Sequence, residues 1–359
     1  MRCMYEEFIS WIEDNDYLYK NYCDMEVCLK KYLEQRMRGD REKAENICKN
    51  FGTVVGKCDE ISYDEEGVPE AYVILHFLDR YHRFQLILLE MFRKGIFPIK
   101  KNIRIMDVGT GPGPSLYAVS DMIALFQKYE EEKQGKTAIA SVSMDYVEQS
   151  QGFRDFLHHM TEWLMAYRDK IYVPFHHGTY YDAGQLDFTG RVERVNFIWE
   201  NGRYTYRETY DEYTKKRFDL VIYSNFLTNM SVLERFALQL EKAAFFLRKE
   251  GVIVIVGGNP HDRKYAPVYE KIDDIILKQS RRSGRGGSSC NRIGNIEQMH
   301  YGNDIIDASI KKFYREELDI LTKGDWEKNL EEEFRKQMSR FIEGEKETTW
   351  YYVLYSKQM

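Results

Sequence analysis

The stretch that decides the fold lies between residues 103 and 115 and reads IRIMDVGTGPGPS. Residues 103–108 form a short apolar run, which is typical of a buried strand. The three glycines after it allow a sharp turn and a close approach between the backbone and a ligand. Residues 115–130 then carry apolar side chains at helical spacing. We therefore predict a strand, a glycine-rich turn and a helix in direct succession.

The spacing of these glycines differs from that of a dinucleotide-binding loop. The nicotinamide and flavin fingerprint is G-x-G-x-x-G, whereas the third glycine here comes one residue early and position 114 is a proline. A proline has no backbone N–H to donate to a pyrophosphate. Asp107 stands two places before the first glycine. The pattern favours a ligand that carries an amino-acid group over one that carries phosphates.

Strands and helices alternate beyond this turn. We predict further strands at 139–147, 171–175, 218–223, 251–256 and 348–355, with helices at 153–168 and 232–247 between them. Continuous apolar strands suit a parallel sheet buried on both faces, and the alternation with helices indicates a doubly wound α/β fold. Residues 1–98 read as helical, including a strong amphipathic helix at 70–94. We therefore predict a helical N-terminal lobe, 1–98, followed by a catalytic domain, 99–359.

Two segments interrupt the alternation. Within an insertion at 184–217, two alternating runs flank Asn201-Gly202, which is a strong signal for a type I′ β-hairpin. We expect this hairpin to form a flap near the carboxyl edge of the sheet, where ligands bind. The second segment, 278–292, is a basic loop rich in Ser and Gly. Both a solvated loop and a contact with phosphate or RNA are consistent with it.

Composition excludes several classes of protein. A net charge of −6 argues against coating nucleic acid through bulk charge, and 43% hydrophobic residues are ample for a packed core. The six cysteines have irregular spacing without a C-x-x-C, which favours free thiols in a reducing compartment. Residues 1–7 have no apolar run long enough for a signal peptide, and no run in the sequence approaches about 20 apolar residues. We predict a cytoplasmic protein without membrane contact.

Residues 107–115 resemble motif I of class I S-adenosylmethionine (SAM) dependent methyltransferases. The resemblance implies SAM as the cofactor and a Rossmann-like sheet of seven strands. In that family the glycine loop wraps the methionyl portion of SAM, and the acidic residue, Asp107 here, orients the loop and the ligand's amino group directly or through water. The loop residues implied in cofactor binding are Gly109, Thr110, Gly111 and Gly113.

The same resemblance implies a carboxylate at the end of the second strand that bridges the ribose hydroxyls, because a carboxylate accepts two hydrogen bonds at once. Asp145 and Glu148 are the two candidates. We prefer Glu148, since the apolar run continues through Val147. After the third strand, Thr179 or Asp182 is expected to contact the adenine.

A narrower resemblance covers about residues 70–275. Residues 219–227, DLVIYSNFL, resemble the D-L-V-x-x-S-x-x-L segment of a methyltransferase-like family associated with the small ribosomal subunit, including mitochondrial members. This implies a ribonucleoprotein acceptor. We also expect Ser224, which follows the fourth strand, to contact the cofactor. The cysteine cluster that this family carries after the fifth strand is missing, because only Cys290 lies there. We therefore predict no metal site.

The sequence lacks the catalytic motifs of two classes of methyltransferase. Residues 224–227 lack the two prolines of amine-directed nucleic-acid methyltransferases, and Cys290 is not in a Pro-Cys motif that would supply a thiolate nucleophile. Direct transfer from the sulfonium remains, which depends mainly on positioning. Asn225, Asn259 and His261 are candidates to face the methyl group, with His261 as a base.

The sequence thus predicts SAM-dependent methyl transfer, with RNA or a ribonucleoprotein as the favoured acceptor. Arg281, Arg282 and Arg285 of the basic loop are the residues expected to contact RNA or the ribosome. Two alternatives stay open. One is a small-molecule methyltransferase, and the other is a non-catalytic assembly factor that binds SAM.

Overall fold

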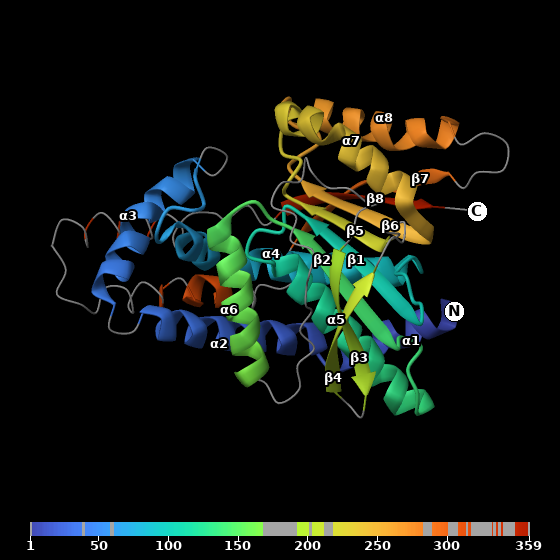
Figure 1. Ribbon diagram of the computed structural model, residues 1–359, viewed down its shortest axis with the longest axis horizontal. Helices are drawn as coiled ribbons and strands as arrows, with labels where there is room; N and C mark the ends of the chain where they lie inside the picture. The colour runs from blue at the N-terminus through green and yellow to red at the C-terminus, as the bar shows by residue number, and fades with distance from the viewer. Residues whose placement is uncertain are drawn as a thin grey trace.

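The protein is described from a computed structural model (Figure 1). It describes residues 2–37, 40–57, 61–167, 192–200, 203–211, 218–282, 289–300 and 349–357, with short pieces at 308–313, 315–316, 332, 335–336 and 339. The helices are α1 Arg2–Asp14, α2 Tyr17–Met37, α3 Arg41–Lys57, α4 Val68–Arg93, α5 Pro114–Gln134, α6 Gln151–Tyr167, α7 Met230–Phe246 and α8 Ala266–Arg282. The strands are β1 Asn102–Val108, β2 Ser141–Val147, β3 Val192–Glu200, β4 Arg203–Asp211, β5 Phe218–Ser224, β6 Leu247–Gly257, β7 Cys290–His300 and β8 Thr349–Lys357.

The eight strands of the described residues form one mixed sheet in the order β4-β3-β2-β1-β5-β6-β8-β7. The four central strands, β2, β1, β5 and β6, are parallel, while β3 and β4 at one edge and β8 and β7 at the other are antiparallel. The chain steps from β1 to β2 on one side and later returns to β5 on the other side of β1. The strand order therefore reverses between β1 and β5, and such a switch point is where open α/β sheets bind ligands.

Helices cover both faces of the sheet, as Figure 1 shows. Alternate residues of each central strand enter two separate cores, so that Ile105 of β1 faces one core and Met106 faces the other. The first core also holds buried residues of α1–α6, and the second holds those of α7 and α8. The predicted α/β fold with a parallel centre is confirmed.

The N-terminal helices share the first core with the sheet. Phe8 of α1 packs against Phe92 of α4 at 4.7 Å and against Phe126 of α5 at 5.0 Å between ring centroids. Helix α4 is buried along most of its length and lies against α5. The predicted helical character of this region is confirmed, while its division from the rest of the chain as a separate lobe stays a prediction.

The predicted sheet of seven strands differs from the one that the described residues form, in which six strands and the two-stranded insertion make a sheet of eight. The predicted strand at 171–175 lies outside the described residues. Strand β7 was missed because the basic loop was predicted to extend to residue 292, whereas Cys290–His300 pairs with β8. The start of that loop belongs to α8, which continues to Arg282.

The predicted hairpin is confirmed, since β3 and β4 pair antiparallel from Val192↔Asp211 to Glu200↔Arg203. Its predicted place is wrong. Strand β3 pairs with Ser141–Ser143, the first residues of β2, and the last pair of the hairpin, Glu200↔Arg203, therefore lies toward the amino edge of the sheet. Edge strands offer unpaired backbone groups, so the insertion extends the sheet instead of forming a flap.

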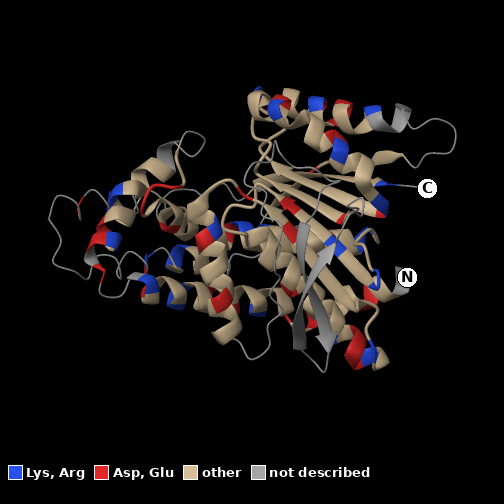
Figure 2. Ribbon diagram, in the orientation of Figure 1, with Lys and Arg blue, Asp and Glu red and all other residues tan. Residues whose placement is uncertain are grey.

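Charges are mixed along the surface helices. Figure 2 shows acidic and basic residues interspersed on helices such as α3 and α8. Helix α8, for example, carries Glu270, Lys271, Asp273, Asp274 and Lys278. Among the described residues, no helix combines the length and the apolar character that crossing a membrane requires.

Candidate functional site

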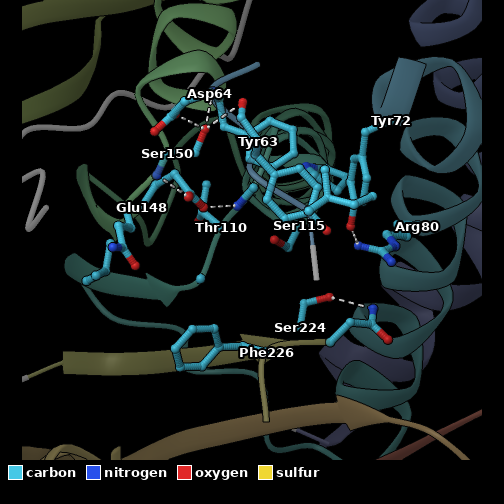
Figure 3. Close-up of a pocket in the computed structure, with 18 of the residues that line it drawn as sticks. Tyr63, Asp64, Tyr72, Arg80, Thr110, Ser115, Glu148, Ser150, Ser224 and Phe226 are labelled. Carbon is cyan, nitrogen blue, oxygen red and sulfur yellow. Dashed lines mark hydrogen bonds between the residues drawn. The ribbon is translucent and has the colours of Figure 1, made fainter. Parts of the chain in front are cut away.

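A cavity of about 390 Å³ opens at the switch point, where β1, β2 and β5 end (Figure 3). This volume lies within the range of about 300–1,000 Å³ usual for small-molecule sites. The residues that line it are Ile61, Ser62, Tyr63, Asp64, Tyr72, Arg80, Gly109, Thr110, Gly111, Pro114, Ser115, Val147, Glu148, Gln149, Ser150, Phe153, Ser224, Asn225, Phe226 and Phe236.

The glycine loop, residues 109–113, already uses its backbone donors within the protein. The N–H groups of Gly109 and Thr110 both donate to the Val147 carbonyl, at 2.9 and 3.1 Å. The Gly111 N–H donates to Glu148 Oε2 at 2.6 Å, and the Gly113 N–H donates to the Thr110 carbonyl at 3.1 Å. Pro112 has no N–H. A phosphate-binding loop works by turning such groups toward the ligand, so this loop is not built to hold a pyrophosphate.

Two of the loop's glycines are required by its geometry. Gly111 has a φ of +58° and a Cβ built there would meet nothing within 4 Å, so a side chain would project into open space beside the cavity. Gly109 has a φ of +71°, and a Cβ there would meet the Phe226 ring at 2.1 Å. The loop therefore stays bare toward the cavity and close to the end of β5.

Asp107 lies beneath the loop, completely buried, and does not line the cavity. Its Oδ2 accepts a hydrogen bond from the Ser115 hydroxyl, and Ser115 does line the cavity. Its other oxygen, Oδ1, is buried and has no hydrogen-bond partner among the described residues. Burial raises the pKa of Asp107 to about 6, helped by the charge of Glu148 and opposed by the hydroxyls of Ser115 and Thr110.

Glu148 lines the cavity directly after β2 and ties two backbone segments together. Its two oxygens accept from the N–H groups of Gly111 at 2.6 Å and Ser150 at 2.8 Å. Burial raises the pKa of Glu148, while these backbone N–H groups oppose the rise. Asp145, the other candidate, is buried within β2 beside Met106 and is not part of the cavity lining. The structure thus brings the preferred carboxylate to the cavity.

The end of β5 supplies the opposite wall. Ser224 and Asn225 line the cavity, and Asn225 holds a left-handed φ of +54° while its N–H donates to the Val256 carbonyl at 3.0 Å. His261 is exposed in the turn after β6, where its N–H donates to Asn259 Oδ1, and neither residue lines the cavity. The structure therefore does not bring His261 to the site. Thr179 and Asp182 lie outside the described residues.

Sequence reasoning missed one wall of the cavity, which we call the N-terminal wall: Ile61, Ser62, Tyr63, Asp64, Tyr72 and Arg80. Ser150 fastens it to the carboxyl edge of the sheet, because its hydroxyl contacts the Tyr63 carbonyl at 3.1 Å and Asp64 Oδ1 at 2.9 Å. No motif marks these residues. They are separated from the glycine loop by about 30 residues or more, and only the packing of α4 brings them to it.

Within the described part of the chain, no three His, Cys, Asp or Glu side chains are placed to hold a metal ion. Cys290 is buried in β7, and burial raises the pKa of its thiol to about 12. Such a thiol is not a ready nucleophile at neutral pH. The side chains of Arg281, Arg282 and Arg285, the predicted RNA contacts, lie outside the described residues.

Comparisons with known proteins find only distant similarity. The sequence matches no model of a known protein family, and no curated sequence matches it. Among solved structures, a phosphoethanolamine N-methyltransferase from Haemonchus contortus, bound to S-adenosylhomocysteine, has 14% identity and a TM-score of 0.40 over 87% of this chain. The chain spans 60% of that enzyme's length.

Two further solved structures have the same level of similarity. A SAM-dependent methyltransferase from Thiobacillus denitrificans, also bound to S-adenosylhomocysteine, has 15% identity and a TM-score of 0.38, covering 80% of this chain and 98% of its own. The [4+2]-cyclase SpnF has 11% identity and a TM-score of 0.38, covering 78% and 80%. What this chain binds therefore has to be inferred from its own residues.

Proposed function

We propose that the protein is a SAM-dependent methyltransferase that binds SAM in the cavity at the carboxyl ends of β1, β2 and β5. One observation carries the proposal. Every N–H of the glycine loop is satisfied within the protein, and two buried carboxylates, Asp107 and Glu148, lie around it. This arrangement opposes a phosphate and favours a ligand with positive charge, such as the ammonium and sulfonium groups of SAM.

The residues present fit this cofactor. Glu148 uses one lone pair on each oxygen for a backbone N–H, so each oxygen keeps another that can accept from a ribose hydroxyl. The Ser115 hydroxyl donates to buried Asp107 and also lines the cavity, so we propose that it links the Asp107 carboxylate to the ligand's amino group. Thr110 and Ser224 stand at the same cavity as further polar contacts.

SAM supplies a methyl group on a positively charged sulfur, which a nucleophile can attack directly. The protein's part is to hold both reactants in line and to exclude water. The rings of Phe226 and Phe236, 5.0 Å apart between centroids, line the cavity and give it an apolar side. Asn225 at the end of β5 is the polar group that we propose to orient the acceptor. RNA as the acceptor stays a prediction.

Binding of S-adenosylhomocysteine by a Glu148→Gln variant tests the cofactor site. The single oxygen of an amide cannot accept from the backbone N–H groups of Gly111 and Ser150 and also from the two ribose hydroxyls. We therefore expect the affinity for S-adenosylhomocysteine to fall at least tenfold. Glu130→Gln is a matched control, because Glu130 is also buried and accepts from the Ala138 N–H at 2.7 Å, at the far end of α5. Equal affinity in the two variants would contradict the assignment of Glu148.

Methyl transfer itself is tested with SAM labelled in its methyl group. The purified protein is incubated with a cell extract, and the label is followed into RNA, protein and small-molecule fractions. We expect label in one fraction with the wild type and its loss with Glu148→Gln. Tight cofactor binding with no label in any fraction would instead favour the non-catalytic alternative.

A further inference from the structure

The cavity has a basic end opposite its acidic one. Figure 3 shows Glu148 and Arg80 at opposite sides of the view, with Tyr63 and Tyr72 between them. Arg80 comes from α4 and Glu148 from the segment after β2, and both line the same cavity. We infer that the acceptor is a small molecule with an anionic group, a carboxylate or a phosphate, that Arg80 binds. This inference rests on the proposed function, because it assigns the remainder of the same cavity.

Arg80 is half-buried without an acidic partner among the described residues. Its guanidinium donates a hydrogen bond to the Tyr72 hydroxyl and lies 5.0 Å from the Tyr72 ring centroid. The other described arginines of α4 do have such partners: Arg83 pairs with Asp79 at 3.1 Å, and Arg93 pairs with Glu13 at 2.5 Å. A partly desolvated charge is costly unless it is paired, so an anionic ligand group would stabilise Arg80.

The guanidinium is held in place before any ligand arrives. Tyr72, which fixes it, belongs to a cluster of three rings, with Tyr63 at 5.4 Å and Phe153 at 5.1 Å between centroids. Tyr63 in turn lies 4.8 Å from Phe153. A preorganised guanidinium loses less side-chain freedom on binding and can present two parallel N–H donors to a carboxylate or a phosphate.

The same rings indicate the rest of the acceptor. Tyr63, Tyr72 and Phe153 all line the cavity beside Arg80, so an apolar or flat portion next to the anionic group would be buried against them. Two carboxylates close to Arg80 in the wall or in the sequence are already engaged: Asp64, in the same wall, accepts from the Ser150 hydroxyl, and Asp79, which directly precedes Arg80, pairs with Arg83 at 3.1 Å. Neither is positioned to neutralise Arg80, since neither forms an ion pair with it.

Benzoate and inorganic phosphate are the probes for this site. Their binding to the full-length protein is measured by calorimetry, with and without saturating S-adenosylhomocysteine, for the wild type and for Arg80→Gln. We expect millimolar binding of at least one anion to the wild type and at least a tenfold loss in Arg80→Gln. Arg83→Gln, one turn along the same helix but paired with Asp79, should bind the anion as the wild type does. Benzoate binding alone would indicate a carboxylate, and phosphate binding alone a phosphate.

The readouts separate this inference from the proposed function. Arg80→Gln should keep its affinity for S-adenosylhomocysteine within about twofold, because Arg80 lies at the other end of the cavity. Failure of the wild type to bind S-adenosylhomocysteine would contradict the proposed function. The anion titrations in the absence of S-adenosylhomocysteine would still show whether Arg80 binds an anion. Unchanged anion affinity in Arg80→Gln, or no anion binding by the wild type, would overturn the inference. Binding of a short single-stranded RNA but of neither anion would overturn it as well.

Discussion

Replacing Asp107 by asparagine should make the protein more stable at neutral pH. Asp107 is completely buried, and its pKa is raised from 3.8 to about 6 by burial. In the unfolded chain the pKa returns to about 3.9. The folded state therefore binds the proton more tightly, and the free energy of unfolding falls as the pH rises through this interval. The loss levels off only well above pH 6, where the folded carboxyl is fully ionised.

The size of the effect follows from the two pKa values. Relative to low pH, the raised pKa of Asp107 lowers the free energy of unfolding by about 1 kcal/mol at pH 4.5 and by about 3 kcal/mol at pH 8, at about 1.4 kcal/mol for each unit of difference between the folded and unfolded pKa values. Asparagine has nearly the same shape, stays neutral and can still accept from the Ser115 hydroxyl. Its gain over the wild type should therefore grow by about 2 kcal/mol between the two pH values.

Urea unfolding followed by circular dichroism at pH 4.5 and pH 8 measures this difference. Any cost of the substitution that does not depend on pH cancels when the two differences are compared. The reasoning would be refuted if the difference in free energy of unfolding between Asp107→Asn and the wild type were the same at both pH values, or if it favoured the variant less at pH 8 than at pH 4.5. The same variant should bind S-adenosylhomocysteine more weakly, because the proposed role of the charge lies in binding.

The other predictions concern matched positions in the same fold. Asp219→Asn should lower the free energy of unfolding by about 3 kcal/mol, in contrast to Asp107→Asn, because buried Asp219 pairs with Lys100 at 2.8 Å and Arg248 at 2.9 Å. A variant as stable as the wild type in urea unfolding would contradict this. Gly111→Ala and Gly135→Ala should each cost about 1–2 kcal/mol, since both positions have positive φ and open space at Cβ, but only Gly111→Ala should weaken binding of S-adenosylhomocysteine. Loss of binding in both would show that the effect is not local. Asn229→Ala should cost about 1 kcal/mol and leave binding unchanged, because Asn229 Oδ1 only caps α7 by accepting from the Val232 N–H at 2.9 Å.

The sequence predicts those parts of the fold that depend on local pattern. The glycine loop was located because its residues are contiguous and each has a direct consequence for the backbone. The preference for Glu148 over Asp145 rested on where the apolar run ends, and the structure places Glu148 at the cavity for that reason. The central strands followed from continuous apolar runs that fill both faces of the sheet.

Features that depend on long-range packing were not predictable in this way. The N-terminal wall reaches the cavity only because α4 packs on α5, and its polar contact between Asp64 and Ser150 joins residues 86 positions apart. The hairpin was recognised from Asn201-Gly202, but nothing in its own sequence states which strand it will join or in which direction. Strand β7 mixes exposed and half-buried residues, so its pattern lacks the continuous apolar signal of the central strands.

Calorimetry with two ligands tests the central claim most directly. The purified protein is titrated with S-adenosylhomocysteine and, separately, with NADH, which differ in whether they present an amino-acid group or a pyrophosphate to the loop after β1. We expect saturable heat with S-adenosylhomocysteine and none with NADH, because every loop N–H is engaged and buried carboxylates surround it. Saturation by NADH with no heat from S-adenosylhomocysteine would contradict the account.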